Sequence, residues 1–191
     1  VHEIHPKDLE RAFLDYSPDA ELGGGPYSTK ASGGYWLELS SPCGTRKWPL
    51  GFSIKKAGHT SGSTADSETW SLVGANDSGL KREVIPVLAQ LEISLQRPVK
   101  LICKEDNTAC IAAIKRGYSA ALRYLKRHTN CSLGFTNEVF FPDLNEGSPR
   151  YWAQINYWES KLHKGDWMTK ELSPAAFERA KCLAGFIPSY S

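Results

Sequence analysis

The 191-residue sequence predicts a mixed α/β fold, a five-stranded sheet with flanking helices. Two segments of alternating polarity, residues 33–41 and 47–56, are joined by a Pro-Cys-Gly turn, which is typical of a β-hairpin. A buried apolar run at 99–103 passes directly into helical periodicity at 107–116. Strands therefore come both in a hairpin and in alternation with helices, and this order favours a mixed sheet with helices around it.

The N-terminal half supplies the first three strands and a long helical region. Residues 12–17 are expected to form a short strand, followed by a Gly-rich turn at 21–26 and then the hairpin. A helix is expected to begin at Ser63, with Thr64 as its cap. Two glycines and a proline predict a break between about 77 and 86, after which helical periodicity continues to Leu95.

The C-terminal half supplies the remaining strands and helices. A second, basic helix is expected over 119–130, followed by a turn-rich segment at 144–150. Residues 152–160 fit a helix or a strand, and their aromatic and β-branched content favours a strand at the end of the segment. A Ser-Pro pair then begins a final amphipathic helix over 175–184, with proline at the first helical position.

Length and composition predict one globular domain spanning residues 1–191, with 41% hydrophobic and 23% charged residues. No apolar run approaches the roughly 20 residues of a membrane helix, and no signal peptide is recognisable. Five cysteines form no CxxC pair, which favours a reduced, intracellular setting in the cytoplasm or nucleus. Because the chain begins with Val1, we expect it to be a fragment of a longer polyprotein.

The net charge of +2 conceals an uneven distribution of charge. No acidic residue lies between Asp106 and Glu138. This stretch is either a solvated helix face or a surface that holds the phosphates of a polyanion. Its basic residues include Lys115, Arg116, Arg123, Lys126, Arg127 and His128.

Four acidic residues occupy comparable places at the ends of the predicted elements. Asp19 lies just past the first strand, and Glu68 lies in the first turns of the long helix. Asp106 closes the fourth strand, and Asp166 lies between the last strand and the last helix. Each has a structural alternative, as a turn residue, a helix-dipole partner or a cap. Their joint placement favours a shared site, since α/β sheets bind ligands at the carboxyl ends of their strands.

Five blocks resemble, in order, the ribonuclease H domain of copia-type long-terminal-repeat retrotransposons, which follows the reverse transcriptase in the polyprotein. They are "DAELGGG", "YSTKASGGYWLEL", "LGFSIKKAGHTSGSTADSET", "KEDNTACIAAI" and "YWESKLHKGDWMTKEL". In the last block, the family's Ala-Asp-x-x-Thr-Lys pattern appears as Gly-Asp-Trp-Met-Thr-Lys, residues 165–170. The resemblance covers about residues 12–186 and implies a ribonuclease H-like fold.

The resemblance also implies a metal-dependent hydrolase that cleaves the RNA strand of RNA–DNA hybrids. Its cofactor would be two Mg²⁺ ions, with Mn²⁺ as an alternative, and its partners a hybrid and an upstream reverse transcriptase. Asp19 and Asp106 would be the central catalytic metal ligands, and Glu68 and Asp166 would complete the two sites. Residues implied in nucleic-acid binding are Ser67 and Asn107, for the 2′-hydroxyls, and Arg123, Lys126, Arg127 and His128, for the phosphates.

One departure from the family pattern leaves an alternative open. The family's Lys-His-Ile-Asp appears here as Arg-His-Thr-Asn at 127–130, so an acid is replaced by an amide. In this fold the fourth carboxylate is expected after the last strand, where Asp166 stands. The alternative is a domain that has lost catalysis and only binds nucleic acid or braces a reverse transcriptase.

Overall fold

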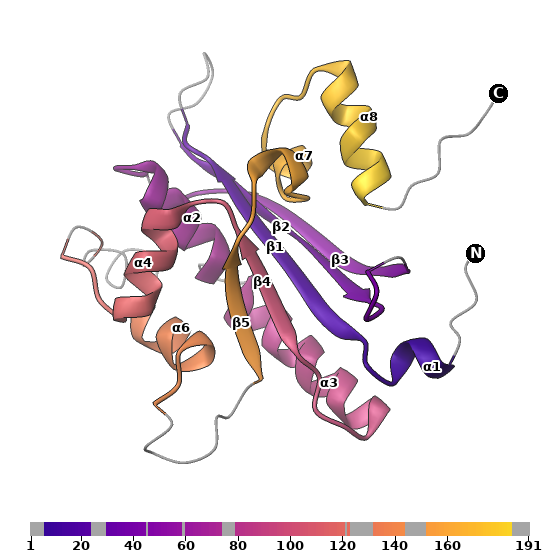
Figure 1. Cartoon of the computed structure of the whole chain (residues 1–191). Coiled ribbons are helices and arrows are strands. Elements are labelled where there is room, and N and C mark those ends of the chain that lie inside the picture. Colours follow the sequence, from indigo (N-terminus) through magenta and orange to yellow (C-terminus); the bar gives the residue numbers. More distant parts are fainter. Residues whose placement is uncertain are drawn as a thin grey trace.

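The computed structural model describes residues 6–23, 30–44, 46–58, 60–73, 79–120, 122, 132–143 and 152–184. Its centre is one five-stranded sheet in the order β3-β2-β1-β4-β5 (Figure 1). The first three strands pair antiparallel, whereas β4 runs parallel to both β1 and β5. The predicted fold class, a mixed five-stranded α/β sheet with flanking helices, is confirmed. The strands are β1 (Phe13–Glu21), β2 (Ser32–Ser40), β3 (Lys47–Lys56), β4 (Leu101–Glu105) and β5 (Ala153–Tyr157).

One face of the sheet packs against four helices through an apolar core. The helices are α2 (Thr64–Val73), α3 (Ile85–Leu95), α4 (Thr108–Arg116) and α6 (Leu133–Phe140). Each contributes buried side chains that meet those of the sheet, and their contact with the strands supplies most of the burial that stabilises them. Representative core residues from these helices and from the sheet are Tyr16, Leu72, Leu88, Ile114 and Val139.

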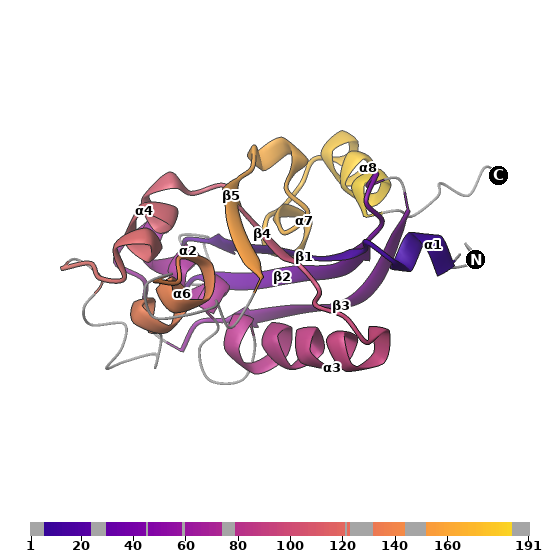
Figure 2. The same cartoon turned by 60° about the horizontal axis from the view of Figure 1, so that its bottom comes forward.

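The opposite face is partly covered by α7 (Asp166–Thr169) and α8 (Pro174–Leu183), as Figure 2 shows. The short α7 packs against β1, β2 and β3. The remaining short elements are α1 (Pro6–Leu9), the π-helical turn η1 (Leu80–Val84) and the 3₁₀ turn η3 (Ser160–Leu162). Among the described helices, none has both the length and the apolar character that crossing a bilayer requires.

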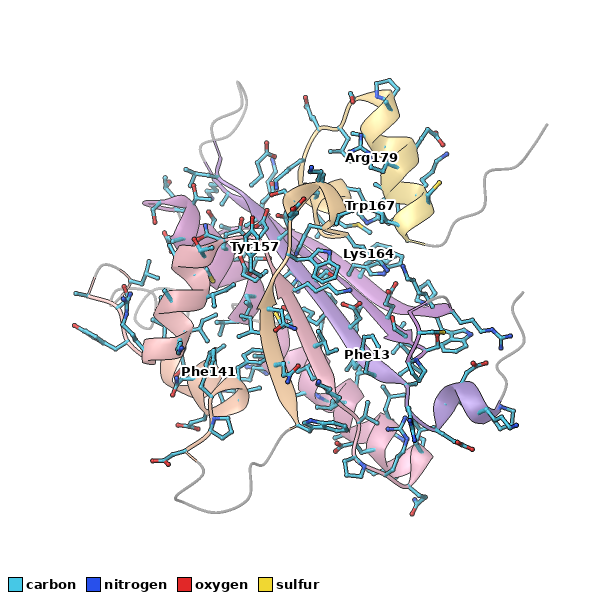
Figure 3. All side chains as sticks on the ribbon, viewed as in Figure 1. Phe13, Phe141, Tyr157, Lys164, Trp167 and Arg179 are labelled. Atoms are coloured by element: carbon cyan, nitrogen blue, oxygen red, sulfur yellow. The ribbon has the colours of Figure 1, made fainter. Side chains whose placement is uncertain are left out.

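The face beneath α7 is polar although it is buried. Successive side chains of a strand point to opposite faces, so Leu14 and Tyr16 of β1 enter the apolar core while Asp15 and Asp19 face α7. On β2, Glu38 is fully buried and forms an ion pair with Lys164, whose side chain lies between the strands and α8 in Figure 3. Buried charges on this face are paired, as the cost of desolvating an isolated charge requires.

Several predicted boundaries match the structure, and others are corrected. Strand 47–56, the helix end at Leu95 and the final helix are confirmed. The first strand continues to Glu21, because Asp19 pairs with Gly34 in the antiparallel ladder, so Asp19 is a strand residue and not a turn residue. The fourth strand begins at Leu101, two residues later than expected.

Other corrections concern the helices. The hydroxyl of Ser63 accepts a hydrogen bond from the Asp66 amide at 3.2 Å, so Ser63, not Thr64, caps α2. Between α2 and α3, Gly79 has a φ of 81° and η1 is a π-helical turn, so the predicted break between about 77 and 86 is confirmed. The helix α6 was not predicted at all. The expected basic helix at 119–130 lies mostly outside the described residues.

Candidate active site

Asp19 lies near the end of β1, and both its main chain and its carboxylate are held. Its carbonyl oxygen accepts a hydrogen bond from the Ser71 hydroxyl at 2.7 Å, which ties β1 to α2. Its carboxylate accepts hydrogen bonds from Thr169 and Lys170, both at the end of α7. The residue is fully buried. Asp19 is therefore fixed by elements that are about 50 and 150 residues away in the sequence.

Glu68 reaches the same region from α2. Two side chains set the position of this helix on the sheet: the Tyr16 hydroxyl donates to the Leu72 carbonyl at 2.7 Å, and the Ser71 hydroxyl donates to the Gly34 carbonyl at 2.9 Å. Glu68 is buried, and its Oε2 atom has no hydrogen-bond partner among the described residues. A buried carboxylate oxygen without a partner costs free energy, and a ligand that contacts Oε2 would remove this cost.

Asp106 follows β4 directly, and a neighbour performs the capping role that was its structural alternative. The Asn107 side chain accepts hydrogen bonds from the amides of Ala109 and Cys110 at 2.9 and 3.0 Å, and so caps α4. The Asp106 carboxylate instead accepts a hydrogen bond from the Ser160 hydroxyl at 2.6 Å. Since Asp106 does not cap the helix, its carboxylate can share a ligand with the neighbouring acids.

These carboxylates meet at one edge of the sheet. Single oxygen atoms of Asp19, Glu68 and Asp106 all lie within 4.8 Å of one another. The cause is topological: β1 and β4 are parallel neighbours, so their carboxyl ends reach the same edge. The three acids form a compact set of hard oxygen donors, the type of ligand that Mg²⁺ and Mn²⁺ prefer.

Asp166 belongs to a second set that shares Asp19. It is the first residue of α7, and its carboxylate accepts a hydrogen bond from the Lys170 ammonium. One oxygen of Asp166, one oxygen of Asp19 and one ring nitrogen of His163 lie within 4.8 Å of one another. Lys170 bridges the two aspartates, with its Nζ atom 3.1 Å from Asp19 Oδ1 and 2.6 Å from Asp166 Oδ1.

The proximity of the acids perturbs their protonation. Burial, together with the charges of Glu105, Asp19 and Asp106, raises the pKa of Glu68 to about 10. Burial and the Asp166 charge raise the pKa of Asp19 to about 6, against the opposing effect of Lys170. Without bound cations the cluster therefore retains protons, whereas a nearby dication would favour the ionised carboxylates.

Two residues of this region were missed from the sequence. Glu105 is fully buried, and burial raises its pKa well above the usual range. Its alternation with Leu101 and Cys103 in β4 was an available signal that it points inward. For His163 no local signal existed, because only the return of the chain after β5 brings it beside Asp19.

The residues expected to bind nucleic acid have separate outcomes. Ser67 is fully buried, and its hydroxyl donates to the Ser63 and Thr64 carbonyls, so it is not available to a 2′-hydroxyl. Asn107 lies at the site edge, where it caps α4. The four predicted phosphate-binding residues lie outside the described part of the chain: Arg123, Lys126, Arg127 and His128.

Comparison with known proteins gives structural likenesses only. No protein-family model and no curated sequence matches the chain. The N-terminal ribonuclease H domain of Rv2228c from Mycobacterium tuberculosis, solved as a fusion with maltose-binding protein, matches with TM-score 0.44 and 10% identity over 91% of this chain and 99% of that one.

Two ribonuclease H1 structures give similar values. LC11 ribonuclease H1, solved in complex with an RNA/DNA hybrid, has TM-score 0.46 and 12% identity over 82% of this chain and 93% of that one. The enzyme from the archaeon Halobacterium salinarum NRC-1 has TM-score 0.43 and 12% identity over 90% and 94%. Likenesses of this size do not establish kinship, and the architecture described above rests on the strand order and directions.

Proposed function

We propose that this chain is a ribonuclease H of a retroelement, which hydrolyses the RNA strand of RNA–DNA hybrids with the help of divalent metal ions. The observation that carries the proposal is the meeting of Asp19, Glu68 and Asp106 at one sheet edge, with Asp166 beside Asp19. As part of the same proposal, the domain functions tethered to an upstream reverse transcriptase, as the resemblance of its sequence blocks implies.

The residues present fit a metal pair. Asp19 belongs to both donor sets and would be shared, with Glu68 and Asp106 on one side and Asp166 on the other. The Oε2 atom of Glu68, buried without a hydrogen-bond partner among the described residues, would gain a partner from such an ion. When bound, such ions activate a water molecule and stabilise the leaving oxygen of a phosphodiester.

The chain itself holds the ligands in place. Ser160 orients the Asp106 carboxylate, and the Glu105 carboxylate accepts a hydrogen bond from the Asn107 amide at 3.1 Å, which fixes the turn that carries Asp106. Ser71 anchors the Asp19 main chain. Because both strand ends are fixed in this way, the carboxylates would need little further ordering to hold metal ions beside a substrate phosphate.

Asp106→Asn is the direct test of the proposal. Asparagine keeps the size of the side chain and can accept the Ser160 hydrogen bond, but it removes the charge that a metal ion requires. We expect hybrid cleavage to fall by at least about a hundredfold, with the melting temperature unchanged because Asn107 caps α4. Glu178→Gln, which removes a carboxylate from the exposed surface of α8, is the charge-matched control.

The alternative function, a domain without catalysis that binds nucleic acid or braces a reverse transcriptase, has a distinct outcome in the same experiment. The folded parent chain would bind the hybrid without cleaving it in Mg²⁺ or Mn²⁺. Cleavage by Asp106→Asn at the parental rate would contradict the metal-ligand role of this residue.

A further inference from the structure

His163 is buried beside the acids with one ring nitrogen unused. It precedes α7, and only 2% of its surface is exposed. Its Nε2 atom lies 2.8 Å from the Lys104 carbonyl oxygen. Since a carbonyl only accepts, Nε2 must carry the proton, and the neutral ring then presents a lone pair at Nδ1. This Nδ1 atom is buried without a hydrogen-bond partner among the described residues.

The free nitrogen is on the side of the ring that faces the aspartates. A Cβ atom placed on Gly165 would lie 3.0 Å from Nδ1 and 2.9 Å from Cε1 of His163, and it would also meet Asp19 Cβ. Gly165 therefore packs directly against both Asp19 and the Nδ1 edge of the His163 ring, so this edge of the ring lies beside Asp19. Nε2 is engaged by Lys104, so Nδ1 is the nitrogen that can bind a ligand within the 4.8 Å group of Asp19, His163 and Asp166.

We infer that Asp19, His163 and Asp166 form a mixed nitrogen and oxygen site that binds a divalent first-row transition ion such as Mn²⁺ in preference to Mg²⁺. Imidazole nitrogen favours transition ions, whereas Mg²⁺ prefers oxygen ligands only. The Nε2–H hydrogen bond to a main-chain carbonyl is the arrangement by which metal-binding histidines are usually oriented. The second set, Asp19, Glu68 and Asp106, offers oxygen alone.

The inference deepens the proposed function, since it makes the two metal positions chemically unequal. The position on the Glu68 side accepts Mg²⁺ or Mn²⁺, and the position on the His163 side selects the transition ion. Metal binding is measurable without RNA cleavage, so the two proposals fail independently.

Lys170 is the competitor for this site. Its ammonium group contacts one oxygen of Asp19 and one oxygen of Asp166, where it supplies part of the positive charge that the aspartates need. The ion must share these oxygens with Lys170 or displace it. Lys170→Met, which keeps the length of the side chain and removes its charge, should therefore tighten Mn²⁺ binding at this position.

The test is Mn²⁺ binding to the full chain, followed by electron paramagnetic resonance. In the parent we expect bound Mn²⁺ to show hyperfine coupling to an imidazole nitrogen. His163→Gln keeps a donor for the Lys104 carbonyl but removes the nitrogen ligand. It should lose this coupling and bind Mn²⁺ at least about tenfold more weakly, with Mg²⁺ affinity unchanged.

Two further variants make the result decisive. Glu68→Gln should lose hybrid cleavage but keep the nitrogen coupling, since Glu68 belongs only to the other set. Lys170→Met should keep the coupling and bind Mn²⁺ more tightly, and this test stands even where His163→Gln fails to fold. Absence of coupling in the parent, or coupling that persists in a folded His163→Gln variant, would overturn the inference. Coupling in a parent that cleaves no hybrid would preserve the metal site and reject the nuclease.

Discussion

Replacing Gly165 by alanine tests how tightly the structure packs around Asp19. The backbone of Gly165 has φ −62° and ψ −35°, which alanine adopts without strain. The added methyl group, however, would lie 2.9 Å from Cε1 and 3.0 Å from Nδ1 of His163, and it would also meet Asp19 Cβ. Both neighbours are buried and held by hydrogen bonds, so neither moves freely.

The size of the effect follows from the packing. Inserting a methyl group into a filled interior costs about 1–3 kcal/mol. For a chain of this length each kcal/mol lowers the melting temperature by about 2–4 °C, so Gly165→Ala should melt about 2–12 °C below the parent. Gly51→Ala is the matched control, because a Cβ atom at Gly51 meets nothing within 4 Å.

Thermal unfolding monitored by circular dichroism, together with Mn²⁺ titration, measures both consequences. Displacement of Asp19 should weaken metal binding as well as stability, since Asp19 belongs to both donor sets. Equal melting temperatures for Gly165→Ala and Gly51→Ala would refute the reasoning from packing.

Three further predictions concern charge and metal. Glu38→Gln leaves the Lys164 ammonium buried without its counter-ion, so it should destabilise the chain by about 3–5 kcal/mol in urea unfolding; a loss below 1 kcal/mol would show that the pair is solvated. Adding Mn²⁺ at about 100 times its dissociation constant should stabilise the parent by about 2.7 kcal/mol, and calorimetry showing no shift would mean that no ion binds the folded state selectively. The third change replaces Arg123, Lys126 and Arg127 by alanine. It should weaken hybrid binding and flatten the slope of log affinity against log salt by about one unit per lost phosphate contact. An unchanged slope would show that these residues form a solvated face.

The sequence by itself determined the elements whose signals are local. Alternating polarity located β3 with its observed bounds, and the Ser-Pro pair located the start of α8. Acids placed at strand and helix ends indicated which carboxylates to compare, because the carboxyl ends of neighbouring parallel strands meet at one edge of a sheet. The sequence left open whether Asp106 caps the following helix, and only the capping hydrogen bonds of Asn107 show that it does not.

Tertiary structure decided which residues share the site. Parallel pairing of β1 and β4 brings Asp19 to Asp106, and the return of the chain after β5 adds His163 and Lys170. The contact between Lys170 and Asp19 joins residues that are 151 positions apart. No periodicity or turn signal encodes such a contact, because it depends on how the strands pair and how α7 packs on the sheet. The sequence thus specified the acids, and the packing of the sheet placed the His163 ring and the Lys170 ammonium beside them.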